Sequence, residues 1–352
     1  MIKIVAHYLP QFYDLPENEA LRGRGATDWT AVKEARPLFA GHEQPRRPLG
    51  GKYYRLDDGE VLRWQVPLAL AHGLYGFCFR HYWCDGRPLW EKPAEWLLAD
   101  SSLKLHFCFA WGRVPWARPD GREQRVSREP QAGTEPDWQA HFSYVAPFFR
   151  DPRYIKIDRK PVFIIDDSRR IPEAGRLLES WNACAAKEGF PGICFIQMLS
   201  RGPLDHRSLP FDAKLYFEPG YTIGHDMPPP PGNRIDYDDI YRALLGRTPG
   251  KGGREIPGVF TDWDDSPRRG GDSIVCAGST PAKFEAYLLE QIKRCASRFD
   301  SDLLFINGWN AWADGAHLEP DERCGSGYLE AVKGAKERCF GLDLPLFYRT
   351  LF

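Results

Sequence analysis

The stretch 303–320, LLFINGWNAWADGAHLEP, decides the fold class of this chain. It opens with four bulky apolar residues, which are enough to form a short buried strand. Polar and aromatic residues then follow within a few positions: Asn307, Trp309, Asn310, Trp312, Asp314, His317 and Glu319. A buried strand that ends in such side chains is typical of a parallel α/β enzyme, whose chemistry lies at the carboxyl ends of its strands. We therefore expect residues 307–319 to form part of a functional site.

The overall composition indicates a globular protein without a polyanionic partner. Of its 352 residues, 43% are hydrophobic, which suffices for a sizeable core. The formal net charge of −1 gives no basis for binding nucleic acid or an anionic membrane surface. No apolar run approaches the length of a membrane span, and strand-like sequence begins at Ile2, where a signal peptide would lie. We expect a cytoplasmic protein with no nucleic-acid partner and no membrane span.

The cysteines and histidines form no recognisable metal-binding pattern. The chain has nine cysteines but no CxxC pair, and Cys78, Cys108 and Cys194 lie inside strand-like runs. The loop histidines nearest to acids, His225 and His317, lack the three-ligand pattern of a catalytic zinc site. The sequence therefore predicts reduced, buried cysteines, no metal and no other cofactor.

Eight short apolar runs are candidates for parallel strands. They are residues 2–8, 74–81, 103–110, 161–165, 193–198, 213–217, 258–261 and 303–307. Helix-like segments separate most of them or follow the last one, at 59–72, 137–149, 172–187, 237–245, 281–297 and 327–336. The crossover at 199–209 has no obvious helix. Strands that alternate with helices predict the α/β class and a single (β/α)8 TIM barrel over residues 1–352, with 338–352 as a C-terminal tail.

The long irregular segments all follow strands rather than precede them. They are residues 10–58, 111–136, 219–236 and 262–279. In barrels the loops after strands build the catalytic face, whereas the loops before strands build the stable end. The difference in length therefore predicts which end of the barrel is functional.

Most of the predicted strands end in polar or aromatic residues. These are His7, Tyr8 and Gln11 after the first strand, His81, Tyr82 and Trp83 after the second, Trp111, Asp166 and Asp167, Gln197, Glu218, and Asp262 to Asp264. His7 and His81 are equally compatible with satisfied core histidines, and for Asp166 and Asp167 a capping role is favoured. Glu218, between Phe217 and Pro219, is expected to be partly buried, which requires a charge partner or a raised pKa.

Several long motifs resemble the WbsX-type glycan-synthesis proteins, which belong with the endo-α-mannosidases of glycoside hydrolase family 99. They are HYLPQFY at 7–13, TDWTAVKEARPLFAGHEQPRRP at 27–48, FCFRHYW at 77–83, WDDSPRR at 263–269 and INGWNAWADGAHLEPD at 306–321. The similarity runs from residue 1 to about residue 335. It implies a (β/α)8 barrel that acts on glycans, with two catalytic glutamates in a motif Asn-Glu-Trp-x-Glu.

The chain departs from that motif at both catalytic positions. The motif corresponds here to Asn310, Ala311, Trp312, Ala313 and Asp314. In the retaining hydrolases of the family, the first glutamate deprotonates the sugar 2-hydroxyl, which attacks the anomeric carbon and gives a 1,2-anhydro sugar. The second glutamate protonates the leaving oxygen and later activates water. Asp314 keeps a carboxylic acid, whereas Ala311 cannot accept a proton.

A missing base has a predictable effect, because a positioned general base contributes about 10²–10⁴-fold to the rate. Three explanations for Ala311 remain open. The residue is an engineered change that traps a bound glycan, or Glu218 or Asp264 has taken over the base role, or the protein binds glycans without turnover. We favour the first, because the constellation around position 311 remains dense.

We therefore predict a glycoside hydrolase, retaining in its parent form, that cleaves a bacterial surface or related polysaccharide. Asp314 is the predicted acid/base and position 311 the vacated base. The predicted substrate-binding residues are His7, Tyr8, Gln11, Trp29, His81, Tyr82, Trp83, Trp111, Glu218, Asp264, Trp309, Asn310, Trp312, His317 and Glu319. The alternatives are a glycosyltransferase of surface polysaccharide (O-antigen, lipopolysaccharide or capsule) synthesis and a non-catalytic glycan-binding protein.

Overall fold

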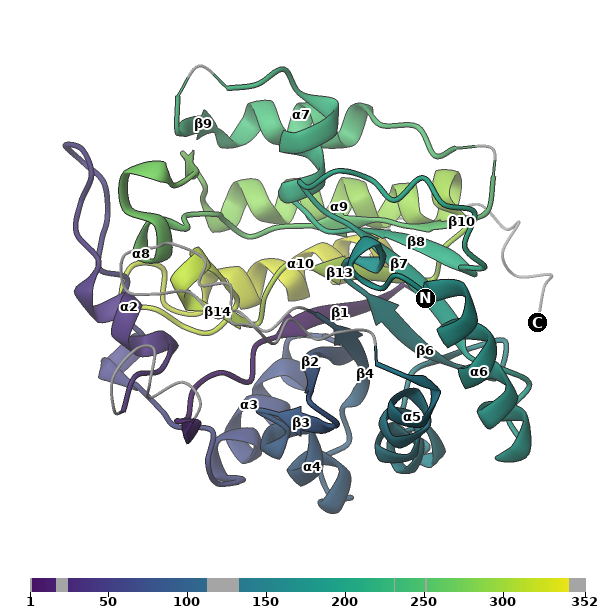
Figure 1. The fold of residues 1–352 in the computed structure, drawn as a ribbon. Coiled ribbons are helices and arrows are strands. Elements are labelled where there is room, and N and C mark those ends of the chain that lie inside the picture. Colours follow the sequence, from purple (N-terminus) through teal and green to yellow (C-terminus); the bar gives the residue numbers. More distant parts are fainter. Residues whose placement is uncertain (1, 17–24, 113–132, 231, 251, 342–352) are drawn as a thin grey trace.

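The computed structural model of the chain describes residues 2–16, 25–112, 133–230, 232–250 and 252–341. Its centre is a parallel sheet (Figure 1) in the order β10-β8-β7-β6-β4-β2-β1-β13-β11. The strands are β1 (Lys3–Tyr8), β2 (Gly76–Cys84), β4 (His106–Trp111), β6 (Lys160–Ile165), β7 (Cys194–Leu199), β8 (Ala213–Tyr216), β10 (Arg254–Ile256), β11 (Gly258–Val259) and β13 (Leu303–Ile306). Each predicted apolar run supplies one of these strands or strand pieces, so that prediction is confirmed.

The sheet closes into a barrel at Pro257. The two ends of the strand order, β10 and β11, are consecutive pieces of one chain segment that only this proline separates. A proline has no amide hydrogen to donate to a neighbouring strand, so it interrupts a strand locally. Its carbonyl still accepts a hydrogen bond from the Phe305 amide at 3.2 Å. The predicted (β/α)8 barrel is therefore confirmed, with its seventh strand divided in two.

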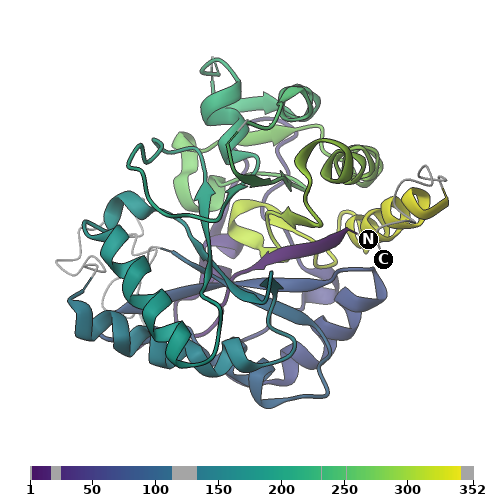
Figure 2. The ribbon, with the colours of Figure 1, turned by 90° about the vertical axis from the view of Figure 1, so that its right-hand side faces the viewer.

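Amphipathic helices surround the barrel, as Figure 2 shows from the end where the chain begins. They are α3 (Glu60–Ala71), α4 (Lys92–Ala99), α5 (Glu135–Arg150), α6 (Ala174–Lys187), α7 (Tyr237–Gly246), α9 (Pro281–Arg294) and α10 (Gly327–Gly341). The sequence missed α4, because eight residues give too few turns for a periodic signal. The crossover at 199–209 contains no helix, in agreement with its sequence.

The segments that follow the strands gather at one end of the barrel, at the left of Figure 1. Two short helices that the sequence did not predict lie there, α2 (Asp28–Glu34) and α8 (Ser266–Arg269). So does the small hairpin of β14 (Asn310–Ala311) and β15 (Ala316–His317). Most of the long segment after the third predicted strand, 113–132, lies outside the described residues. The structure describes no helix long and apolar enough to cross a membrane.

Closure of the barrel depends on Gly258, where β11 follows Pro257. A Cβ atom on Gly258 would lie 2.1 Å from the carbonyl oxygen of Tyr216, so the backbones must separate to accept any side chain. We predict that Gly258→Ala lowers the free energy of unfolding by about 1–3 kcal/mol, the usual range for overpacking. The matched control is Gly246→Ala in α7, which meets nothing within 4 Å and should be neutral or stabilising. Urea denaturation of both variants measures the difference, and equal stabilities would contradict this account of the closure.

Candidate active site

The segment after β13 folds back on itself as a compact hairpin. Asn310 and Ala311 pair antiparallel with Ala316 and His317, and a single helical turn connects the two short strands. Gly315 adopts φ +64° at that turn, a conformation that favours glycine, and its backbone closely approaches Asp264. The tight turn leaves Ala311 and Asp314 on one small unit at the functional end of the barrel.

The Glu319 carboxylate holds this unit on the barrel. Its Oε1 accepts hydrogen bonds from the Gln65 amide at 2.6 Å and the Trp309 indole at 3.1 Å. Its Oε2 accepts from the Trp312 indole at 2.7 Å and the Tyr54 hydroxyl at 2.9 Å. Burial raises the pKa of Glu319 to about 7, although all four donors favour the charged form. These donors come from the hairpin, from α3 and from the segment between β1 and α3.

Asn310 and Tyr8 extend this network to the first strand. The Asn310 side chain accepts from the Leu9 amide at 2.8 Å and donates to the Leu9 carbonyl at 2.9 Å. The Tyr8 hydroxyl donates to Gln65 at 2.7 Å, and Gln65 in turn donates to Glu319. The predicted site residues Tyr8, Trp309, Asn310, Trp312 and Glu319 thus meet in one cluster. All five side chains are buried, and they contact one another and the barrel.

We predict that Glu319→Gln destabilises the protein by about 2–5 kcal/mol. An amide would turn an N–H group toward two of the four donors, and each buried donor without an acceptor costs about 1–3 kcal/mol. The matched control is Glu322→Gln, because Glu322 is half-exposed and its ion pair with Arg47 is 4.0 Å long, too long and too exposed to contribute much stability. Chemical denaturation of the two variants provides the comparison. A loss for Glu319→Gln no larger than that of the control would contradict the role given to this carboxylate.

Asp314 is fixed by an arginine that also holds a second acid. Arg268 Nε donates to Asp314 at 2.9 Å, and the two terminal nitrogens of Arg268 donate to Asp28 at 3.3 and 2.8 Å. Burial raises the pKa of Asp314 above its usual value, and the nearby guanidinium limits the rise. The Asp314 side chain remains 20% exposed. It is therefore an acid that holds its proton to a higher pH than usual and can still reach a ligand.

Asp264, by contrast, is enclosed by donors. His42 Nε2 lies 2.8 Å and Gln44 Nε2 2.5 Å from its Oδ2, and the Ser266 amide donates to its Oδ1 at 3.1 Å. Burial opposes ionisation of Asp264, but the Arg46 charge and these hydrogen bonds outweigh it, so its pKa lies below the usual value. Arg46 also pairs with Asp262 at 2.8 Å. The backbone amide of Asp264 donates to the Asp314 carbonyl, which brings this cluster beside the hairpin.

Glu218 lies at the end of the sixth predicted strand, and both of its carboxylate oxygens are also bonded to the protein. Arg247 donates to its Oε1 at 2.8 Å, and the Thr222 amide donates to its Oε2 at 3.1 Å. Its side chain is fully buried. The expectation that Glu218 needs a charge partner is therefore met by Arg247, which also pairs with Asp226.

Most of the remaining predicted residues belong to two aromatic groups. The ring centroid of Trp29 lies 5.4 Å from that of Trp312, and the His317 ring stacks on Trp312 with a centroid distance of 3.8 Å. The second group follows β2 and β4: His81, Trp83 and Trp111 surround His141, with His81 Nε2 2.7 Å from His141 Nε2. Burial lowers the pKa of His81 to about 3, so the pair is neutral. Three predicted residues, His7, Gln11 and Tyr82, are buried near the same end of the barrel.

The site contains partners that sequence reasoning did not single out. His42, Gln44, Arg46, Tyr54, Gln65, Arg268 and His141 contact predicted residues, and Asp28 contacts Arg268. Four of them lie within the motif at 27–48 and one within the motif at 263–269, so those motifs carried a signal. Gln65 and His141 lie inside helices, where their residue type gave none. In the ranges that the structure describes, no three His, Cys, Asp or Glu side chains group as a metal-ion site.

One large hollow lies apart from this cluster. It has a volume of about 650 Å³ and is lined by residues before or at the start of strands, including Ile2, Lys3, Ser301 and Leu303. Large apolar pockets are ordinary first candidates for ligand sites. In barrels of this type, however, catalysis takes place at the opposite end. We therefore place the candidate site at the end that carries the hairpin.

Comparison with solved structures defines the class of fold. The endo-α-mannosidase of glycoside hydrolase family 99 from Bacteroides thetaiotaomicron superimposes with a TM-score of 0.60 at 14% identity. The match covers 96% of this chain and 97% of that one. A protein described as glycoside hydrolase-like gives the same TM-score at 12% identity, over 95% and 93% of the two chains. The barrel thus has the fold of these two proteins.

The chain itself belongs to the WbsX family. The family described as "Glycosyltransferase WbsX" matches residues 4–332, which is nearly the whole chain. Two curated relatives, each described as "Uncharacterized protein WxcX", come from Xanthomonas campestris pv. campestris strains ATCC 33913 and B100. Each is 34% identical over 348 residues, covering 95% of this chain and 50% of the relative. The chain therefore spans about half the length of the curated relatives it matches.

Proposed function

We propose that this chain is a carbohydrate-active enzyme that cleaves a glycosidic bond in an oligosaccharide or polysaccharide, with Asp314 as proton donor. The observation that carries the proposal is the contrast between Asp314 and the other acids of the site. The side chain of Asp314 is 20% exposed, whereas those of Asp264 and Glu218 are 1% and 0% exposed. Burial also raises the pKa of Asp314, which suits a group that must hold a proton until it is donated.

The contacts of the other acids indicate that they have a different role from Asp314. Asp264, Glu218 and Glu319 accept hydrogen bonds from the protein at both carboxylate oxygens. Removing a donor from such a buried acid leaves an uncompensated charge, which is energetically costly. These carboxylates therefore stay bonded to their protein donors. We assign these acids to positioning the site, in place of the direct substrate contacts expected for them. Neither Asp264 nor Glu218 is then a substitute for the base that Ala311 lacks.

The glycosyltransferase alternative is favoured by one specific finding, the description of the family to which the chain belongs. A transferase would need an activated sugar donor, such as a nucleotide sugar, and its product would appear only when the donor is present. A non-catalytic glycan-binding protein is the third candidate, and Ala311 is the residue that supports it. Activity measurements with and without a nucleotide sugar, together with glycan binding, separate all three.

We predict that Ala311→Glu raises the hydrolytic rate by about 10²–10⁴-fold, because it restores a general base beside Asp314. Binding affinity should change little. Adding Asp314→Asn to that variant should remove most of the gain on a natural glycan, whose leaving group needs protonation. The loss should be smaller on an aryl glycoside, whose leaving group departs without full protonation. The measurement is kcat/KM for the four combinations at these two positions on both substrates, taken from a panel of bacterial surface polysaccharides and aryl glycosides.

The same panel contains the outcomes that would contradict the hydrolase proposal. Product formation that strictly requires an added nucleotide sugar would favour the transferase. Negligible turnover in all four variants, with retained glycan binding, would favour the binding protein. The exposed Ser143→Ala variant serves as a control, because Ser143 lies on α5 and, among the described residues, its hydroxyl bonds to the Gln139 carbonyl alone.

A further inference from the structure

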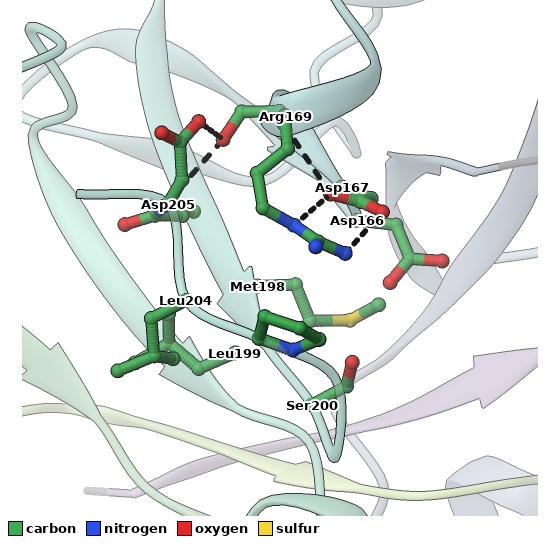
Figure 3. Close-up of a pocket in the computed structure, with 11 residues that line it drawn as sticks. Asp166, Asp167, Arg169, Met198, Leu199, Ser200, Leu204 and Asp205 are labelled. Atoms are coloured by element: carbon green, nitrogen blue, oxygen red, sulfur yellow. Dashed lines mark hydrogen bonds and ion pairs between the residues drawn. The ribbon is translucent and has the colours of Figure 1, made fainter. Parts of the chain in front are cut away.

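A small polar pocket opens at the ends of β6 and β7 (Figure 3), at the same end of the barrel as Asp314. Its volume is about 40 Å³, room for about three water molecules when one water needs roughly 10–15 Å³ in the same measure. A group of this size is a hydroxymethyl substituent or two adjacent hydroxyls, and a whole sugar ring is too large. The pocket is lined by Asp166, Asp167, Ser168, Arg169, Gln197, Met198, Leu199, Ser200, Pro203, Leu204 and Asp205.

The three acids of the pocket are already neutralised. Arg80 donates to Asp166 at 2.5 Å, Arg169 donates to both oxygens of Asp167 at 2.8 Å, and Arg207 pairs with Asp205 at 2.7 Å. Gly112 allows the first of these pairs, because a Cβ there would lie 2.8 Å from the Arg80 guanidinium. Acids that are each paired with an arginine leave no excess negative charge to attract a cation. The pocket is thus suited to a neutral, hydrogen-bonding group.

Hydrogen-bonding capacity remains on the pocket wall. Arg80 occupies one oxygen of Asp166, and no other described residue donates to its second oxygen, which leaves that oxygen as an acceptor. The Gln197 amide makes one long contact, 3.5 Å to the Ser168 hydroxyl, and the Ser200 hydroxyl makes none within the described part of the chain. Met198, Leu199 and Leu204 supply the apolar part of the lining (Figure 3). A carbon that carries a hydroxyl group suits this lining, because the hydroxyl can bond to the polar residues and the carbon can contact the apolar ones.

We propose that this pocket is a subsite that receives the hydroxymethyl group of a neutral hexose unit in the glycan. The inference rests on the proposed function and narrows its substrate. Three strands, β4, β2 and β1, separate β6 from β13 in the sheet. The pocket and the hairpin that carries Asp314 therefore lie on different sides of the barrel mouth. A glycan that contacts both must contain more than one sugar unit. The substrate class is therefore an oligosaccharide or polysaccharide with a hexose some way from the cleaved bond.

The test uses methyl glycosides of mannose, glucose and galactose, each compared with its 6-deoxy counterpart by saturation-transfer NMR. We expect at least one hexose to bind, with the strongest saturation at its C6 protons. Its 6-deoxy counterpart should bind about tenfold more weakly, which corresponds to about 1.4 kcal/mol, the order of one lost hydrogen bond. Gln197→Ala should weaken hexose binding by a similar factor, whereas Ser143→Ala should not.

A second variant, Ser200→Leu, fills the pocket without removing the Gln197 amide and should abolish hexose binding. It keeps the test decisive if Gln197→Ala fails to fold, which thermal melting reveals. Equal binding of hexose and 6-deoxyhexose, or binding that both variants leave unchanged, would overturn the subsite. Because these measurements involve no turnover, they are independent of the hydrolase assay. Hexose binding at this pocket with no hydrolysis by any variant would refute the proposed function and retain the subsite.

Discussion

The buried carboxylate of Glu319 is the constraint on which the functional end of this barrel depends. It binds four donors, from Tyr54, Gln65, Trp309 and Trp312, and so joins the hairpin after β13 to α3 and to the segment after β1. A buried acid is stable only when its oxygens are well supplied with hydrogen bonds. The two indoles are therefore oriented by the acid as much as by packing. This arrangement holds Ala311 and Asp314 in place on a short turn.

Around this anchor, three arginines each hold two further acids. Arg268 lies between Asp28 and Asp314, Arg46 between Asp262 and Asp264, and Arg247 between Glu218 and Asp226. Buried ion pairs contribute little net stability, but losing one partner is costly, so such networks enforce one geometry. The consequence for function is that most acids at this end fix the site. Asp314, at the edge of the network, is the one we assign to chemistry.

The sequence predicted the barrel well because its strands are continuous apolar runs and its long segments all follow strands. The sequence did not predict elements that are short or that depend on a single residue. Helix α4 has eight residues, and the division of the seventh strand at Pro257 follows from a missing amide donor that pattern reading did not consider. For Asp167 the expected capping role is confirmed, since its side chain accepts from the Arg169 amide. Its neighbour Asp166 instead pairs with Arg80, on another strand.

The composition of the candidate site was predictable, but its internal contacts were not. The density of Trp309, Trp312 and Glu319 in one stretch indicated a special loop, and the structure brings those residues together. Their partners Tyr54 and Gln65 are more than 250 positions away, and nothing in the sequence shows which donor meets which acid. Arg268 was not predicted for the same reason. Its role depends on contacts with both Asp28 and Asp314, which the sequence does not show.

The central claim is that a glycan binds where the segments after the strands meet. Hydrogen–deuterium exchange, measured with and without an oligosaccharide selected from the surface-polysaccharide panel, tests it most directly. The account predicts slower exchange in the segments 27–48, 263–269 and 306–321, at the end that carries the hairpin. Protection confined to the opposite end, around the hollow lined by Ile2 and Leu303, would contradict it.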